Sequence, residues 1–400
     1  MNHMQSNPPT PGALSPFARR TLLKLGAAMV VAPAFLKTSS AAATGLAQSE
    51  TPVAPPAPVI SAPASISSTV VTTASASISA TTSISASAST SALPGLSATR
   101  RPFGRAMINN AAVRAAPGTQ AELVRSLALN EVIAISGQIE SDDSPSKHNK
   151  IWYKTVDGFV HSSLVQPSEN LPNKPVTQVD AAGFWGEVTV PNVEMRRAAD
   201  PAAGLSYTSH YGCIFRITEL REGADKTAWY HLSDGANNNL FARADAFRPM
   251  AAAEFAPISP EVPLSDKHIE VDLKQQIATA FEGDKAVFTA RVATGLGGFN
   301  TTAGQHLIFE KRPSRRMIGG SGRGYYDLPG IGWVSYFTRS RIAFHATYWH
   351  NDYGAPRSRG CVNMLPEDAQ WVYRWTLPNA FDEAAVFTSA RTEGSLVKVF

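Results

Sequence analysis

A histidine and a cysteine near the end of the chain have the types and spacing of a base and its nucleophile. His345 precedes Cys361 by sixteen residues. A free thiol has a pKa near ~8.5 and is mostly un-ionised at neutral pH, so an imidazole within hydrogen-bond reach is needed to take its proton. Arg357 and Arg359 are the adjacent cations, which would stabilise a thiolate. Gly360 permits close backbone approach, so its N–H and that of Cys361 could face an oxyanion.

The sequence around this pair resembles the catalytic domain of the L,D-transpeptidase (YkuD-like) family. That family's signature is a histidine, a spacer of this length, then Ser/Thr-His-Gly-Cys, a variable residue and Asn or Arg. The second half reads here Ser358-Arg359-Gly360-Cys361-Val362-Asn363. Arg359 therefore stands where the signature has its second histidine. The resemblance covers residues 264–400 and includes Lys267 to Thr294, Gly295 and Thr302-Ala303-Gly304.

The resemblance implies a mainly β fold, with a β-sandwich-type catalytic domain and a short helix after the catalytic cysteine. It implies that Cys361 attacks the carbonyl before D-Ala in a tetrapeptide stem of peptidoglycan, which releases D-Ala and leaves a thioester. His345 would act as general base and then as acid, oriented by the backbone carbonyl of Ala346. No metal or other cofactor is required. The candidate substrate-binding residues are Arg359, Arg357, Ser358, Asn363, Tyr348 and Trp349.

Several acceptors could resolve the same thioester. An amine of a neighbouring stem would give a 3→3 cross-link, water would make the protein an L,D-carboxypeptidase, and a D-amino acid would give exchange. Two other classes compete with this family. An NlpC/P60-type cysteine peptidase has its cysteine before its histidine, whereas no histidine follows Cys361 here. A non-catalytic wall-binding protein is favoured only by Arg359.

Two alternatives remain open for single residues. His350 lies eleven residues before Cys361 and is a second candidate base. Cys213 lies in a strand-like run, and it is either a buried free thiol or a disulfide partner of Cys361 in an oxidising compartment.

Strands are predicted to carry the catalytic pair. Lys267–Asp272 alternates polar and apolar residues, as a half-buried strand does. Ile277–Phe281 resumes this pattern, and Val287–Thr294 forms a third strand, so we expect an antiparallel meander. A helix is predicted over Pro366–Trp375, because proline at its start and acidic residues in its first turn suit a helix N-terminus.

Two small β modules are predicted before the catalytic domain, at residues 103–168 and 182–249. Trp152-Tyr153 in the first is echoed 77 residues later by Trp229-Tyr230 in the second, and Asp-Gly follows each pair, which indicates a domain-sized repeat. Both segments resemble bacterial SH3-like modules. That resemblance implies that they bind peptidoglycan stem peptides or position the enzyme. The alternative is that they are structural spacers.

The N-terminal part of the chain resembles an export signal. The run Arg19-Arg20-Thr21-Leu22-Leu23-Lys24 precedes an apolar stretch too short to span a bilayer, and Ala41-Ala42-Ala43 offers a cleavage site. Residues 1–43 are therefore predicted to be a twin-arginine-type signal peptide. Residues 44–102 consist mostly of small and polar residues, which predicts a disordered linker. We expect an exported protein of the cell envelope, in the periplasm or cell wall, with membrane contact only during export.

The composition excludes several classes of protein. The chain has 400 residues, and 36 Lys and Arg residues against 32 Asp and Glu residues give a net charge of +4. This excess is too small for a dedicated nucleic-acid binder, but it suits an acidic partner such as a cell-wall polymer. Two cysteines exclude a disulfide scaffold and a cysteine-rich zinc module.

Overall fold

The computed structural model describes residues 101–237, 239–322, 325–388 and 393–400. The predicted signal peptide and nearly all of the predicted linker lie outside these residues. Within them strands predominate and only one α-helix, α1, occurs, so the prediction of a mainly β fold is confirmed. None of the described helices is long and apolar enough to cross a membrane.

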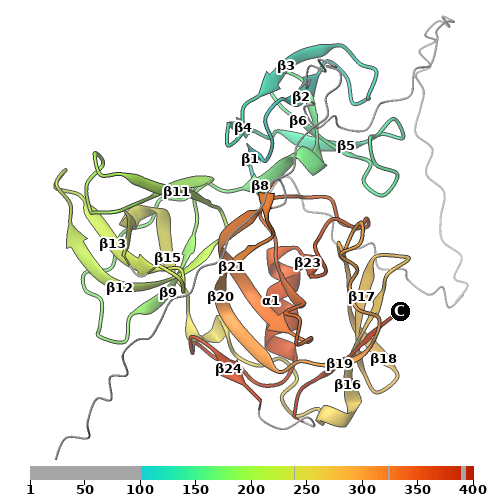
Figure 1. Ribbon diagram of the computed structural model, residues 1–400. Helices are drawn as coiled ribbons and strands as arrows, with labels where there is room; N and C mark the ends of the chain where they lie inside the picture. The colour runs from blue at the N-terminus through green and yellow to red at the C-terminus, as the bar shows by residue number, and fades with distance from the viewer. Residues whose placement is uncertain (1–100, 238, 323–324, 389–392) are drawn as a thin grey trace, which may run out of the picture. The chain divides into compact units, whose positions relative to one another are not determined.

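The first module consists of short strands joined by tight turns (Figure 1). These elements are β1 Phe103–Ala106, β2 Ala111–Arg114, β3 Leu123–Leu127, β4 Val132–Ala134, β5 Gly137–Glu140, β6 Ile151–Lys154, β7 Phe159–His161, the 3-10 helix η1 Ser162–Leu164 and β8 Val165–Ser168. Strand β1 pairs with β4 and β8, β2 with β3 and β7, and β6 with β5 and β7, all antiparallel. Val113, Tyr153 and Val160 belong to a core of this module alone.

The second module forms one antiparallel sheet in the order β11-β10-β14-β13-β12-β9-β15. Its elements are β9 Phe184–Val188, β10 Asn192–Arg196, β11 Leu205–His210, β12 Ile214–Glu222, β13 Ala228–Ser233, β14 Leu240–Arg243, η2 Ala244–Ala246 and β15 Phe247–Pro249. Phe215, Tyr230 and Phe247 are buried together in its core.

The strand pairings of the two modules correspond one to one. The strands β9, β10, β11, β13, β14 and β15 take the places of β1, β2, β3, β6, β7 and β8, and the long strand β12 takes the places of both β4 and β5. Both modules end on a strand, a 3-10 turn and a final strand. The sequence echo therefore accompanies a repeat of topology. The resemblance to SH3-like modules stays a prediction.

The catalytic segment opens with the predicted meander. Two 3-10 turns, η3 Ala252–Glu254 and η4 Leu264–Asp266, lead into β16 Lys267–Asp272, β17 Ile277–Glu282 and β18 Lys285–Arg291. Strand β17 pairs antiparallel with both of its neighbours. Strand β18 ends before the predicted Thr294, because Ala293 and Gly295 leave the sheet and bridge Asn363 and Ser358. Strands β19 Gly304–Leu307 and β25 Leu396–Val399 complete the sheet in the order β18-β17-β16-β25-β19.

A second sheet of the catalytic segment has the order β23-β22-β21-β20-β24. Its strands are β20 Glu310–Gly319, β21 Tyr326–Tyr336, β22 Ala343–Ala346, β23 Val362–Met364 and β24 Val386–Phe387. Helix α1, Pro366–Trp375, lies between this sheet and the first (Figure 1), and one core contains buried residues of both sheets and of the helix. The helix has the predicted bounds.

Two buried lysines lie at the C-terminal end of α1. Lys267 Nζ donates to the carbonyls of Ile258, Ser259 and Trp375 at 3.0, 2.6 and 3.3 Å. Lys311 Nζ donates to the carbonyls of Thr376 and Pro378 at 2.8 and 2.9 Å. The last carbonyls of a helix have no partner within the helix and carry partial negative charge, so the two ammonium groups satisfy this end of α1.

Candidate active site

The pairing of β22 with β23 determines where the catalytic pair lies. These two strands are parallel, with His345 opposite Asn363 and Phe344 opposite Val362. Alternate residues of a strand share a face, and directly paired residues lie on the same face. Cys361 directly precedes β23, two positions before Asn363, and continuing the alternation would put it on the face that carries His345. Phe344 and Val362 point the other way, into the core against α1. The strand pairing thus brings His345, the predicted base, to the segment that carries Cys361, the predicted nucleophile.

The loop that carries Cys361 is held by the first sheet of the catalytic segment. Ala293 and Asn363 exchange two backbone hydrogen bonds of 3.0 and 2.9 Å. The N–H of Ser358 donates to Thr294 O at 2.9 Å. Thr301 Oγ1 donates to Gly360 O at 2.7 Å, and its side chain is buried. The segment after β18 therefore positions the loop of Cys361, the predicted nucleophile.

His345 is arranged to act as a proton acceptor. Its side chain is only 2% exposed, and its Nδ1 lies 2.9 Å from the carbonyl oxygen of Ala346. A carbonyl can only accept, so Nδ1 carries the hydrogen and Nε2 keeps its lone pair. Burial lowers the pKa of His345 to about 4, more than the Ala346 carbonyl raises it. The imidazole is therefore neutral at neutral pH, with Nε2 free to accept a proton.

Cys361 is a protonated thiol at rest. Burial raises its pKa to about 11, although the backbone N–H of Ala343 opposes this shift. The thiol Sγ lies 3.8 Å from the carbonyl oxygen of Arg341, which accepts its hydrogen. A thiol with this pKa needs a base to become a nucleophile, and His345 is the predicted base.

The predicted oxyanion donor Gly360 is engaged elsewhere. Its N–H donates to Ser358 Oγ at 3.1 Å, and the same Oγ donates to the carbonyl of Cys361 at 2.5 Å. The φ of Gly360 is +112°, which only glycine adopts readily. An oxyanion role for Gly360 requires its amide to exchange this bond for one to substrate, and it stays a prediction. The hydroxyl of Ser358 is thus engaged within the loop, and its role in substrate binding stays a prediction.

Arg359 lies beside the nucleophile between two aromatic rings. Its guanidinium carbon lies 5.4 Å from the ring centre of Phe299 and 5.1 Å from that of Tyr326. Burial raises the pKa of Tyr326, and the neighbouring Cys361 raises it further. Phe299 was not among the predicted site residues. Its only sequence signal is the Gly297-Gly298 turn, which lifts an exposed aromatic side chain toward the loop of Cys361.

Two other candidate substrate residues belong to a buried polar network. Asn363 is 1% exposed, and its Nδ2 lies 2.9 Å from His350 Nε2. Arg357 forms an ion pair with the buried carboxylate of Asp352. Burial lowers the pKa of His350 to about 3. Because Nε2 of His350 faces the Asn363 amide, the geometry favours His345 as the base.

Tyr348 and Trp349 have different surroundings. The Trp349 ring centre lies 5.8 Å from that of His345, so this side chain lines the base. The Tyr348 ring instead packs at 5.3 Å from His210 of the second module and contacts that module's core. Substrate binding by Tyr348 stays a prediction, and its ring is turned toward the second module. Cys213 is buried and Cys361 is partly exposed, and both are free, so these two form no disulfide.

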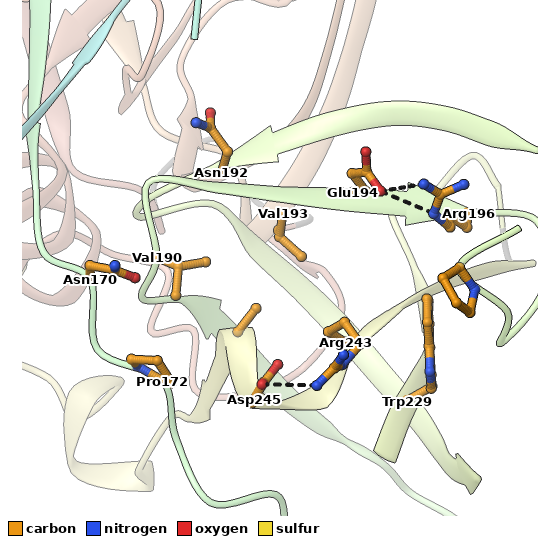
Figure 2. A pocket seen from close by; sticks show the side chains of 12 residues that line it. Asn170, Pro172, Val190, Asn192, Val193, Glu194, Arg196, Trp229, Arg243 and Asp245 are labelled. Carbon is orange, nitrogen blue, oxygen red and sulfur yellow. Dashed lines mark hydrogen bonds and ion pairs between the residues drawn. The ribbon is translucent and has the colours of Figure 1, made fainter. Parts of the chain in front are cut away.

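A cavity of about 420 Å³ lies on the second module (Figure 2). Two ion pairs, Glu194–Arg196 and Arg243–Asp245, lie at its edge, and Val193 lies between them. This cavity contains neither Cys361 nor His345. In the described part of the chain, no group of three or more His, Cys, Asp or Glu side chains could hold a metal ion.

Comparison with known proteins finds matches for the C-terminal third of the chain. Residues 266–399 match the family described as YkuD, L,D-transpeptidase catalytic domain. A Bacillus subtilis (strain 168) protein that is named as an L,D-transpeptidase, YciB, is 28% identical over 122 residues, which are 28% of this chain and 62% of the relative.

Two solved structures match the same share of the chain. An L,D-transpeptidase from Mycobacterium smegmatis is 19% identical, with 34% of this chain and 58% of that chain covered and a TM-score of 0.28. The catalytic domain of an L,D-transpeptidase from Enterococcus faecium is 20% identical, with 34% of this chain and 97% of that chain covered and a TM-score of 0.27. The chain thus spans less than two thirds of YciB and of the mycobacterial protein.

Proposed function

We propose that the L,D-transpeptidase catalytic domain of residues 266–399 is a cysteine-dependent acyltransferase that acts on peptidoglycan stem peptides in the cell envelope. The observation that carries this proposal is the parallel pairing of β22 with β23, which sets His345 opposite Asn363, two residues after Cys361. The contact of His345 Nδ1 with the carbonyl of Ala346 supports it, because it leaves Nε2 as the proton acceptor.

In the first step Cys361 is acylated. As Sγ attacks the carbonyl carbon before D-Ala, the thiol proton passes to Nε2 of His345. The pKa values of about 11 and about 4 keep the resting pair neutral, so proton transfer accompanies the attack instead of preceding it. The new C–S bond replaces the C–N bond, and the amine of D-Ala leaves with the proton that His345 returns. A thioester and a neutral imidazole remain.

In the second step an amine of another stem attacks the thioester carbon. His345 takes a proton from that amine and returns it to the departing sulfur, which restores the thiol. The net reaction exchanges one amide bond for another, so it needs no metal and no cofactor. With a diamino acid of a neighbouring stem as the acceptor, the product is a 3→3 cross-link. Water as the acceptor gives a free acid and an L,D-carboxypeptidase.

Substrate carboxylates are assigned to Arg359. Its guanidinium is a planar fork of donors that matches a carboxylate, and the rings of Phe299 and Tyr326 restrict its position near Cys361. Arg357 contributes less directly, because Asp352 already pairs with it. The arginine in place of the signature's second histidine is thus compatible with an active site, since the proton acceptor is His345.

Acylation of Cys361 tests this proposal. The protein is incubated with a carbapenem, whose strained β-lactam carbonyl acylates thiols, or with a disaccharide-tetrapeptide, and Cys361 is examined by mass spectrometry. We expect an adduct in the wild type, none in Cys361→Ala, and acylation slowed about 10²–10⁴-fold in His345→Ala. The matched control is His350→Ala, which should slow acylation less.

Two outcomes would contradict the proposal. If the wild type forms no adduct with either reagent, the non-catalytic wall-binding alternative is favoured. If His350→Ala slows acylation as much as His345→Ala does, the assignment of the base is wrong. With the tetrapeptide, the released products separate cross-linking from hydrolysis, because only cross-linking yields a dimer.

A further inference from the structure

The loop between the two catalytic strands contacts both halves of the active site. It begins directly after Ala346 and contains Trp349, whose ring lies beside His345. It also contains His350, which is hydrogen-bonded to Asn363 next to the nucleophile. A displacement of this loop would therefore move the support of His345.

The first module holds this loop by hydrogen bonds that cross more than a hundred residues of sequence. Arg105 Nη2 donates to the carbonyl of Tyr348 at 2.5 Å. Asn351 Nδ2 lies 3.3 Å from Tyr153 Oη and 3.3 Å from the carbonyl of Ser162. In return, Asn149 Nδ2 donates to the carbonyl of Asn351 at 3.4 Å. These bonds join Tyr348 and Asn351 of the loop to the first module.

Arg105 carries a charged side chain in a buried position. Its side chain is 2% exposed, and all of its hydrogen-bond partners are neutral. Besides Tyr348 they are Gln166 Oε1 at 2.9 Å and Asn130 Oδ1 at 2.8 Å. Burial lowers the pKa of Arg105 to about 10. A buried cation without a counter-ion is costly, so packing of the module alone does not account for it.

The three acceptors of Arg105 give the guanidinium a fixed direction. Gln166 is itself held, since its Nε2 donates to the carbonyl of Tyr211 in the second module at 2.8 Å. The Tyr348 ring packs on His210 of that same module. The residue three positions after the catalytic histidine is thus held through its carbonyl by one module and through its ring by the other.

We propose that Arg105, together with Asn351, is a positioning residue that keeps the loop after His345 in the geometry that lets His345 reach Cys361. The first module is then a working part of the active site rather than a spacer. This inference rests on the proposed function for the roles of His345 and Cys361. In this positioning role the first module needs no bound ligand.

The test measures the reactivity of Cys361 in the folded protein. Iodoacetamide alkylation at pH 7 is followed by mass spectrometry of the peptide that contains Cys361, for the wild type, Arg105→Met and Asn351→Ala. Iodoacetamide needs no substrate site, so its rate reports how readily the Cys361 thiol is deprotonated and reached, whether or not a stem peptide binds. We expect alkylation to slow at least about tenfold in both variants, because general-base assistance contributes about 10²–10⁴-fold. The control is Arg125→Met, which removes an arginine of the same module that pairs with Glu131 and Asp157.

A purely structural role of Arg105 would lower the melting temperature and leave the alkylation rate of the folded molecules unchanged. Both variants alkylating within twofold of the wild type would overturn the proposal. If Arg105→Met does not fold, Asn351→Ala decides alone, since it changes only the loop. If the wild type takes no carbapenem adduct, the proposed function fails, whereas the comparison of alkylation rates still reports on the positioning.

Discussion

The two modules share their strand pairings but meet the catalytic domain through different chemistry. The first module contacts the loop after His345 through directional hydrogen bonds, with Arg105 and Asn351 at their centre. The second packs Ile214 and Trp185 into the core of the catalytic segment itself. Hydrogen bonds specify distances and directions but contribute little net stability each, whereas apolar burial stabilises without direction. Two modules of the same topology therefore have different roles. The first positions the loop after His345, and the second stabilises the catalytic domain.

The second interface depends on two glycines of β21. A Cβ on Gly332 would lie 2.8 Å from Ile214 Cδ1, and one on Gly330 would lie 2.6 Å from Phe215 Cζ. Only glycine lets the strand approach the module this closely. Beside this contact Arg316 Nη1 lies 2.9 Å from Asp234 Oδ2, and the Asp234 side chain is fully buried. An apolar contact and a buried ion pair thus join the module to the catalytic domain.

Removing the cation of that ion pair should give the largest loss of stability. Arg316→Met leaves the buried carboxylate of Asp234 without its counter-ion and should lower the free energy of unfolding by about 3–5 kcal/mol. Arg316 also binds Asp327 at 2.6 Å, so that contact is lost as well. The measurement is urea unfolding, with iodoacetamide alkylation of Cys361 in the folded variant as the second readout. The alkylation rate should remain that of the wild type.

The double variant Arg316→Met/Asp234→Asn is the control. It removes the unpaired charge, so it should be more stable than Arg316→Met alone. A loss below about 1 kcal/mol in Arg316→Met, the range of exposed ion pairs, would show that the second interface is not the stabilising one. A slowed alkylation would show that it also positions the active site.

Acid should weaken the loop at the first interface. The pKa of His350 is lowered from 6.5 to about 3 by burial, and that of His345 to about 4. Below pH 6.5 the unfolded chain takes up these protons while the fold excludes them, so stability is lost as the pH falls from 6.5 toward the folded values. At pH 5 each histidine should cost about 2 kcal/mol. Urea unfolding at pH 7 and pH 5 measures this loss together with that of His210, whose pKa burial lowers to about 2.

The variant His350→Gln isolates one share of this effect. Its stability should fall by about 2 kcal/mol less than that of the wild type between pH 7 and pH 5, because glutamine takes up no proton. An equal fall in both proteins would mean that His350 is not excluded from protonation in the fold, and the polar network with Asn363 would then not be closed to water.

Local patterns account for what could be predicted. The helix over Pro366–Trp375 follows from its proline and acidic first turn, and the strands from Lys267 onward follow from alternation. Both signals lie within a few residues of the element that they predict. The pair His345 and Cys361 was predicted from the resemblance of the sequence around it to the L,D-transpeptidase signature, and its catalytic roles stay a proposal.

Contacts between distant segments could not be predicted. Alternation treats Lys267 as an exposed position, yet it is 2% exposed, because the end of α1 supplies carbonyl acceptors for its ammonium group. Besides β17, strand β16 pairs with β25 at the far end of the chain, and no pattern in either sequence predicts this pairing. Arg105 reads as an ordinary strand arginine, and only the folded chain brings Tyr348 to it. The exposed ring of Phe299 reaches the site through loop geometry that has no periodicity.

The smallest effect is expected from an exposed contact at the first interface. Arg101 Nη2 lies 3.4 Å from Glu367 in the first turn of α1, and the side chains are 19% and 44% exposed. Arg101→Met should cost less than about 1 kcal/mol, because solvent and salt screen such a pair. Urea unfolding at low and high salt should show the difference from wild type shrinking as salt rises. A loss above about 2 kcal/mol would place an appreciable part of the fold's stability in the polar interface, and the division of tasks between the two modules would fail.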